Sequence, residues 1–252
     1  LERQPQDLNV MVLGMDSFND VMNVLSAFQA KIDLTAFEFF DDVAIDKLMA
    51  HGQVQEPFES RTKFYTLLEF EAPYEPIMDK TMAIFEECME QGWVVDGVMS
   101  QSLAQAEELW KLREYISETI SVFTPYKNDV SVLISYVPEF IAEIDHIVSS
   151  NYPDFEVCWF GHIGDGNLHL NILKPANMSK DDFFSECQIV NKYVFETVQK
   201  YGGSVSAEHG VGMTKKPYLN YSRSETEIEY LRAVKKVFDP NNIMNRGKIF
   251  DM

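Results

Sequence analysis

The sequence predicts an α+β fold in which helices pack on one face of an antiparallel sheet. Short apolar runs with strand character alternate with segments of helical periodicity along most of the chain. A tight Asp165-Gly166 turn separates two apolar strands, and such turns join antiparallel neighbours. The glycine-rich GxGxxG and GxxxxGK[ST] segments of parallel nucleotide-binding sheets are missing. We therefore expect a ferredoxin-like arrangement, single or doubled, followed by a C-terminal helical segment.

The first part of the chain opens with strand, helix and strand. Apolar residues at Phe18, Val21, Leu25 and Phe28 have the spacing of one helix face. Gly92 follows a further helical segment and suits a helix C-terminus. Strands are expected at 10–14, 34–40, 63–71 and 93–99, and helices at 18–30, 41–50 and 76–91.

The second part continues the alternation. Pro138 suits the first turn of a helix, and Ser179 and Ser224 each precede an acidic residue at capping-box spacing. A long helix is expected at 102–122, with further helices at 138–150, at 179–200 and from 224 to just before Asp239. Strands are expected at 129–137 and, as a hairpin, within 155–173.

Composition excludes several classes of protein. The chain of 252 residues carries a formal net charge of -19, which argues against binding nucleic acid or an anionic membrane surface. No apolar run approaches the roughly 18 residues of a membrane span, and residues 1–5 do not resemble a signal peptide. The widely spaced Cys88, Cys158 and Cys187 predict free thiols in a reducing, cytoplasmic setting.

The segment Gly161 to Asn171 carries the clearest chemical signal. If the turn is centred on Asp165-Gly166, His162 and His169 become directly opposed neighbours on one face of the hairpin. Two imidazoles so placed could share a divalent metal, and Asn171 would lie on the same face. Taken singly, a histidine on a strand is more often structural, and Gly-Asp-Gly-Asn is first of all a turn.

A second glycine-rich segment, Ser206 to Gly212, contains Glu208 and His209. Glu208 could add a carboxylate ligand, and two histidines with one carboxylate describe a catalytic zinc, iron or manganese site. His209 would then remain as a general base. The same residues could activate water in a metal-dependent hydrolase, and the acidic chain could also be a non-enzymatic binding module.

Arg113 lies on the apolar stripe of its expected helix, so its guanidinium needs a buried partner or a pocket. An internal ion pair would satisfy it, and so would the carboxylate of a substrate. Lys127 could provide a second cation, although a lysine in this position, considered by itself, is more often a surface residue. Ser117, one turn after Arg113, could add a hydrogen bond.

These segments resemble the C-terminal domain of FAD-linked oxidases of the vanillyl-alcohol-oxidase type. The resemblance rests on Gly161 to His169 and Glu208 to Gly212, supported in order and spacing by 109–114, 127–131 and 238–245. It covers nearly the whole chain. Within the family, the pattern is most similar to D-2-hydroxyglutarate dehydrogenases, D-lactate dehydrogenases and the flavin subunit of glycolate oxidase.

The resemblance implies a role for each segment. The metal, zinc by expectation, would be held by His162, His169 and Glu208. His209 would take the proton of the substrate hydroxyl while hydride leaves C2 for the flavin. The remaining implied roles are carboxylate binding by Arg113 and Lys127, substrate positioning by Asn171, and an approach to the flavin by Asn245.

The family pattern also implies that residues 1–252 are one substrate- and metal-binding domain. The flavin-binding domain that precedes it in the family is absent from this chain. We therefore expect that the isolated chain neither binds FAD tightly nor oxidises 2-hydroxy acids. The expected partners are that flavin domain, a 2-hydroxy acid and an electron acceptor, either a protein or a quinone. One departure lies in the tail, where Arg246 replaces the proline usual after Asn245.

Overall fold

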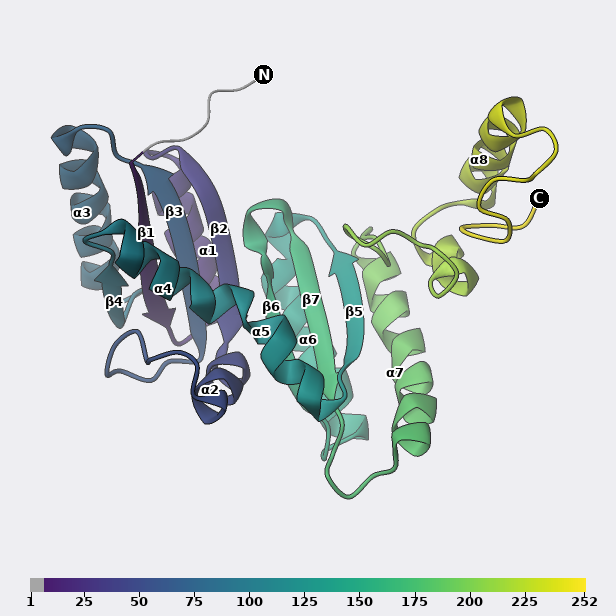
Figure 1. Ribbon diagram of the computed structural model, residues 1–252, viewed down its shortest axis with the longest axis horizontal. Coiled ribbons are helices and arrows are strands. Elements are labelled where there is room, and N and C mark those ends of the chain that lie inside the picture. The colour runs from purple at the N-terminus through teal and green to yellow at the C-terminus, as the bar shows by residue number, and fades with distance from the viewer. Residues whose placement is uncertain (1–6) are drawn as a thin grey trace.

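A computed structural model describes residues 7–252, so the interpretation of residues 1–5 lies outside the described residues. The strands form a single antiparallel sheet in the order β4-β1-β3-β2-β6-β7-β5 (Figure 1). The strands are β1 (Leu8–Met15), β2 (Leu34–Asp41), β3 (Phe64–Glu71), β4 (Asp96–Met99), β5 (Tyr126–Ser131), β6 (Glu156–His162) and β7 (Asn167–Leu173). The predicted antiparallel α+β class is confirmed.

The helices follow the predicted segments closely. They are α1 (Phe18–Gln29), α2 (Asp42–His51), α3 (Glu75–Glu90), α4 (Leu103–Glu114), α5 (Ile116–Thr119), α6 (Val137–Asn151), α7 (Lys180–Lys200) and α8 (Glu225–Phe238). Ser224 and Glu227 form the predicted capping box at the start of α8. The single helix expected at 102–122 is instead divided at Tyr115 into α4 and α5, followed by a 3-10 turn.

The sheet is built from two ferredoxin-like units. The first unit, β1-α1-β2-β3-α3-β4, has the strand order β4-β1-β3-β2. The second, β5-α6-β6-β7-α7, repeats that order, with an isolated bridge between Ser131 and Ser204 in place of its fourth strand. The doubled form of the expected arrangement is therefore the correct one.

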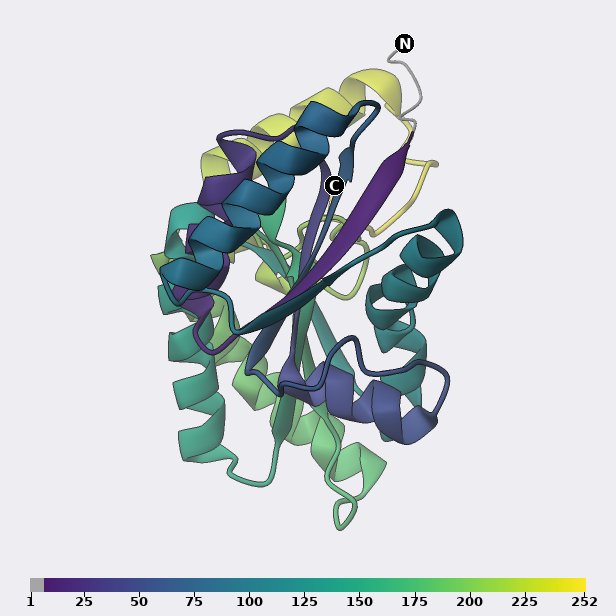
Figure 2. The ribbon, with the colours of Figure 1, turned by 90° about the vertical axis from the view of Figure 1, so that its left-hand side faces the viewer.

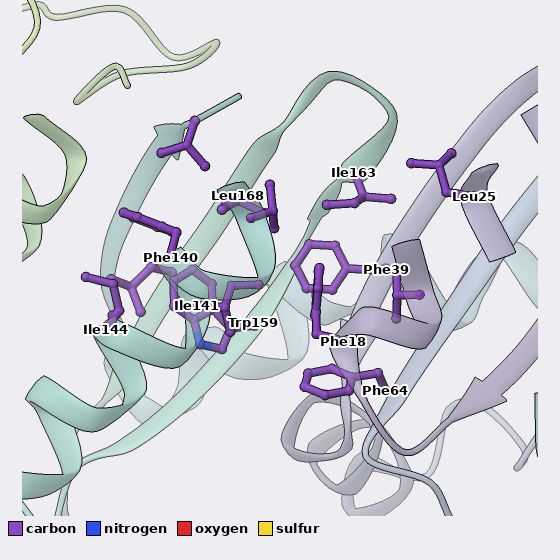
Figure 3. Close-up of a cluster of buried hydrophobic side chains, with 14 of the residues drawn as sticks. Phe18, Leu25, Phe39, Phe64, Phe140, Ile141, Ile144, Trp159, Ile163 and Leu168 are labelled. Atoms are coloured by element: carbon purple, nitrogen blue, oxygen red, sulfur yellow. The ribbon is translucent and has the colours of Figure 1, made fainter. Parts of the chain in front are cut away.

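Helices cover both faces of the sheet, which corrects the expectation of one covered face (Figure 2). On one face, α1, α3, α6 and α7 enclose the larger hydrophobic core, part of which Figure 3 shows around Phe18, Phe39, Phe140 and Trp159. On the other face, residues of α2, α4 and α5 form a second core. Helix α2 connects β2 to β3, whereas α4 and α5 connect β4 of the first unit to β5 of the second. Local periodicity predicts that a segment is helical but does not reveal which face of the sheet the helix covers.

The two units meet along a short seam between β2 and β6. Only three residue pairs are in register there, Glu38 with His162, Phe39 with Gly161 and Phe40 with Phe160. By contrast, β1 and β3 pair over eight positions. The seam places the end of the histidine hairpin beside the first unit.

The histidine hairpin has a longer turn than predicted. Its register pairs His162 with Asn167 and Phe160 with His169, so the two histidines are diagonal neighbours and are not directly opposed. The cause is a 3-10 turn at Ile163–Asp165 followed by Gly166 in the left-handed region, with φ 75°. Both histidines still lie on one face, because the change in register is an even number of residues.

Replacing Gly166 is expected to disturb this hairpin. A Cβ at Gly166 would lie 2.2 Å from the carbonyl oxygen of Val132, and the positive φ adds backbone strain. Gly52 has a similar φ of 76° but no atom within 4 Å of its Cβ position. Left-handed strain alone costs about 1 to 2 kcal/mol, which we expect for Gly52→Ala. Gly166→Ala should lower the free energy of unfolding by clearly more, as measured by urea denaturation. Equal losses in both variants would contradict this account.

The cysteines are free, as predicted, and all three are buried. Among residues 7–252, no helix combines the length and the apolarity that crossing a bilayer requires.

Candidate active site

Four adjacent strands each present one titratable side chain to the same place. Glu38 on β2 is paired in register with His162 on β6, and Asp129 on β5 is paired with His169 on β7. The strand order β2-β6-β7-β5 therefore produces a row of carboxylate, imidazole, imidazole and carboxylate. Both carboxylates are buried, with 5% of Glu38 and 4% of Asp129 exposed.

Glu208 and His209 reach this row from the loop that follows the Ser131–Ser204 bridge. Their backbone N–H groups both donate to Oδ2 of Asp129, at 3.0 and 2.9 Å. The backbone N–H of Ala207 also donates to the Asp129 carbonyl oxygen at 3.3 Å. Asp129 thus fixes the loop against β5.

The Glu208 carboxylate lies between the histidines. Its Oε1 is 3.5 Å from Nε2 of both His169 and His209, and its Oε2 is 3.9 Å from Nε2 of His162. The sequence-predicted residues His162, His169, Glu208 and His209 are therefore brought together.

This donor set fits a divalent metal. One ligand atom from each of Asp129, His169, Glu208 and His209 lies within 4.8 Å of the others. In addition, Oδ1 of Asp129 is buried without a hydrogen-bond partner. Imidazole nitrogens with carboxylate oxygens are ligands that zinc, iron and manganese accept. Relative to the predicted ligands, this grouping adds Asp129 and His209, while His162 is placed at its edge by its 3.9 Å approach to Glu208.

The two hairpin histidines differ in electrostatic environment. Burial, together with the positive charge of Arg113, lowers the pKa of His169 to about 4. Its ring is consequently neutral at neutral and mildly acidic pH, as a metal ligand must be. A hydrogen bond to Glu38 raises the pKa of His162.

Arg113 on α4 has the buried partner that its position in the sequence demanded. Its Nε donates to Oε2 of Glu38 at 2.9 Å, and its guanidinium carbon lies 4.9 Å from the centre of the Phe160 ring. Its side chain is only 10% exposed. Burial lowers the pKa of Arg113, and the charge of Glu38 opposes that shift. The guanidinium is thus held rigidly beside the histidines.

The other predicted residues are placed less tightly. Lys127 is exposed on β5, where its Nζ donates to the hydroxyl of Ser117 at 2.9 Å. Asn171 is buried on β7, and its amide donates to the carbonyl oxygen of His169 at 3.2 Å. Asn245 lies exposed in the tail after α8, and within residues 7–252 no hydrogen bond or ion pair joins it to the histidines.

Glu38 and Asp129 belong to the site but were not among the residues predicted from the sequence. Glu38 stands between Phe37 and Phe39 in an apolar strand, where a carboxylate needs a buried partner. Asp129 lies in a segment used to support the resemblance, but nothing in its spacing indicated that it would hold the loop of Glu208. Glu38 therefore had a signal that could have been used, and Asp129 had none.

Comparison with known proteins matches this chain to one family over residues 4–249, described as FAD linked oxidases, C-terminal domain. A D-2-hydroxyglutarate dehydrogenase of Stutzerimonas stutzeri is 66% identical over 99% of the chain, which spans 54% of that relative. A D-2-hydroxyglutarate dehydrogenase of Xanthomonas citri pv. viticola is 51% identical over 98% of the chain, which spans 52% of it. The chain thus spans about half the length of these relatives.

Solved structures share the fold at low sequence identity. Substrate-bound p-cresol methylhydroxylase superposes with a TM-score of 0.66 at 11% identity, covering 100% of this chain and 54% of that one. For an alkyldihydroxyacetonephosphate synthase, the TM-score is 0.57 at 13% identity, covering 96% and 45% of the two chains. On the family match over almost its entire length, the chain belongs to the FAD-linked oxidases as their C-terminal domain.

Proposed function

We propose that the chain supplies the substrate- and metal-binding half of a flavin-dependent dehydrogenase that oxidises a D-2-hydroxy acid to a 2-oxo acid. The observation that carries the proposal is the convergence of three histidines and Glu208 beside a buried arginine. The names of the two most similar bacterial relatives reported above favour D-2-hydroxyglutarate as the substrate.

Arg113 and Lys127 would bind carboxylate. Arg113 donates its Nε–H to Glu38, and its two terminal amino groups can then form paired hydrogen bonds with a substrate carboxylate. Lys127 is exposed and can turn toward the same ligand. Two cations suit a dicarboxylate such as 2-hydroxyglutarate. Asn171 would position the substrate from β7.

The oxidation removes one proton and one hydride from the H–C–OH group. His209 would accept the hydroxyl proton, because it is exposed and its Nε2 lies 3.5 Å from the Glu208 carboxylate. When bound, FAD accepts the hydride from C2. A divalent metal, zinc by preference, held by His162, His169 and Glu208, would polarise the hydroxyl oxygen.

The flavin would be bound mainly by a partner half, which corresponds to the remaining half of the relatives' length. Helix α8 offers a surface for it. Four side chains on one side of α8 are more than half exposed: Tyr230, Val234, Val237 and Phe238. Such an apolar stripe is unfavourable in water and suits a docked partner. Asn245, in the tail that follows, would then approach the flavin. Repeated turnover further requires an electron acceptor, a quinone or a redox protein, that reoxidises the reduced flavin in a cytoplasmic setting.

Metal analysis tests the proposal directly. We expect the purified chain to retain near-stoichiometric divalent metal after addition of zinc, and a His162→Ala, His169→Ala double variant to retain none. His51→Ala, His146→Ala is a matched control, because His51 ends α2 and His146 is exposed on α6. Equal metal in the double variant and the wild type would contradict the hairpin site. Absence of metal from every sample, including the polypeptide joined to its flavin-binding half, would refute the metal part of the proposal.

A further inference from the structure

His162 and His169 share one geometry: in each ring, both nitrogen atoms lie near a carboxylate. Metal binding accounts for the position of Nε2 but not for that of Nδ1. Each imidazole presents Nε2 to Glu208, at 3.9 Å for His162 and 3.5 Å for His169. Each also presents Nδ1 to a buried carboxylate on the next strand. His162 faces Oε1 of Glu38 at 2.8 Å, and His169 faces Oδ1 of Asp129 at 3.7 Å.

A neutral imidazole carries its proton on either nitrogen, and only the other nitrogen can bind a metal. A carboxylate beside Nδ1 accepts a hydrogen bond and so draws the proton to that side. For His162, this hydrogen bond is already formed. For His169, Oδ1 of Asp129 is a buried oxygen without a partner, and Nδ1–H is the group that can satisfy it after a small movement.

We propose that Glu38 and Asp129 are positioning residues that hold the Nδ1–H tautomers of His162 and His169, so that both Nε2 lone pairs point at the site of Glu208. The use of these Nε2 atoms as metal ligands rests on the proposed function. The contacts at Nδ1, however, are present in the chain without any metal. Asp129 also accepts hydrogen bonds from the backbone N–H groups of Glu208 and His209. It therefore positions both of these residues in addition to His169.

Amide variants reverse the hydrogen bonding at both sites. In Glu38→Gln, the amide oxygen must accept from Arg113, since an arginine can only donate, and the NH₂ group then faces Nδ1 of His162. In Asp129→Asn, the amide oxygen must accept from the two backbone N–H groups, and the NH₂ group faces Nδ1 of His169. A donor at Nδ1 forces the proton to Nε2, the atom needed for the metal.

The matched control is Asp41→Asn on β2. Asp41 is also buried and also accepts two backbone N–H groups, that of Ala44 at Oδ1 and that of Trp159 at Oδ2, at 2.9 and 2.7 Å. It forms no hydrogen bond or ion pair with a histidine among the described residues. Its replacement therefore alters a buried carboxylate and its backbone hydrogen bonds without changing the surroundings of an imidazole.

The experiment records nitrogen–proton correlation spectra of the histidine rings in the metal-free chain at alkaline pH. We expect Nδ1–H tautomers for His162 and His169 in the wild type and in Asp41→Asn. We expect Nε2–H for His162 in Glu38→Gln and for His169 in Asp129→Asn. Zinc affinity, measured by competition with a chelator, should fall about 10- to 100-fold in each of these two variants and stay unchanged in Asp41→Asn.

Nε2–H tautomers in the wild type, or Nδ1–H tautomers that persist in both amide variants, would overturn the inference. If Asp129→Asn does not fold, the wild-type spectrum still tests both residues, and Glu38→Gln tests one of them by substitution. If the tautomers behave as expected but the wild type binds no metal, the positioning role stands and the proposed metal centre fails. The two ideas can therefore fail separately.

Discussion

Replacing His209 with glutamine should lower the rate of flavin reduction by D-2-hydroxyglutarate about 10²- to 10⁴-fold in the polypeptide that joins this chain to its flavin-binding half. That range is typical for loss of a general base. His209 is the most exposed of the three clustered histidines, with 64% of its side chain accessible, so it is the one best placed to meet a substrate hydroxyl. The measurement is the rate of flavin reduction in anaerobic stopped-flow mixing.

Four controls make that result specific to proton transfer. Flavin content and metal content should remain at the wild-type level, and the Kd of the 2-oxo acid product should be nearly unchanged. His146→Gln, on the exposed side of α6, should reduce flavin at the wild-type rate. If His209→Gln loses its metal along with its activity, His209 is a ligand, as its membership of the four-residue grouping also allows, and another group is the base.

Replacing Arg113 with methionine should lower the free energy of unfolding by about 3 to 5 kcal/mol, because it leaves the buried Glu38 carboxylate without its counter-charge. The side chains of the pair are only 10% and 7% exposed, and Nε lies 2.9 Å from Oε2. The guanidinium also loses its position over Phe160. Urea denaturation of the chain measures the effect.

Arg61→Met provides the matched comparison. Arg61 has two acidic partners, Asp46 at 2.9 Å and Glu56 at 3.2 Å, but about half of each side chain or more is exposed. Ion pairs of this kind contribute at most about 1 kcal/mol, so the loss should be small. Arg113→Lys should restore part of the stability but not the paired hydrogen bonds to substrate, which KM would report in the joined polypeptide. Similar losses for Arg113→Met and Arg61→Met would contradict the buried role.

Most elements could be predicted from the sequence, because they depend on local patterns. The meeting of Glu208 and His209 with the histidine hairpin was expected from the family resemblance and not from local patterns. Apolar periodicity fixed α1, and side-chain caps fixed the starts of α7 and α8. The position of Arg113 on an apolar stripe correctly demanded a buried partner. The roles proposed for the site residues all stay predictions: His162, His169, Glu208, His209, Arg113, Lys127, Asn171 and Asn245.

Features that depend on three-dimensional pairing could not be predicted in this way. The hairpin register was wrong because a two-residue turn was assumed where Ile163 to Gly166 form a four-residue loop. The strand expected at 129–137 is Tyr126–Ser131, since residues 134–136 already turn into α6. Asp129 belongs to the site because β5 lies next to β7 in the sheet. Local periodicity predicts strands but does not predict the order in which they pair.

Joining two ferredoxin-like units through β2 and β6 also affects how the sheet ends. Each unit alone would expose two outer strands, whose unpaired backbone groups can recruit strands from other molecules. Pairing of β2 with β6 leaves one unpaired edge strand in each unit. Of the remaining edges, β4 is only four residues long, and β5 is capped by the bridge to Ser204. The backbone of this domain therefore offers little template for sheet-to-sheet polymerisation, whereas apolar side chains of α8 remain exposed to solvent.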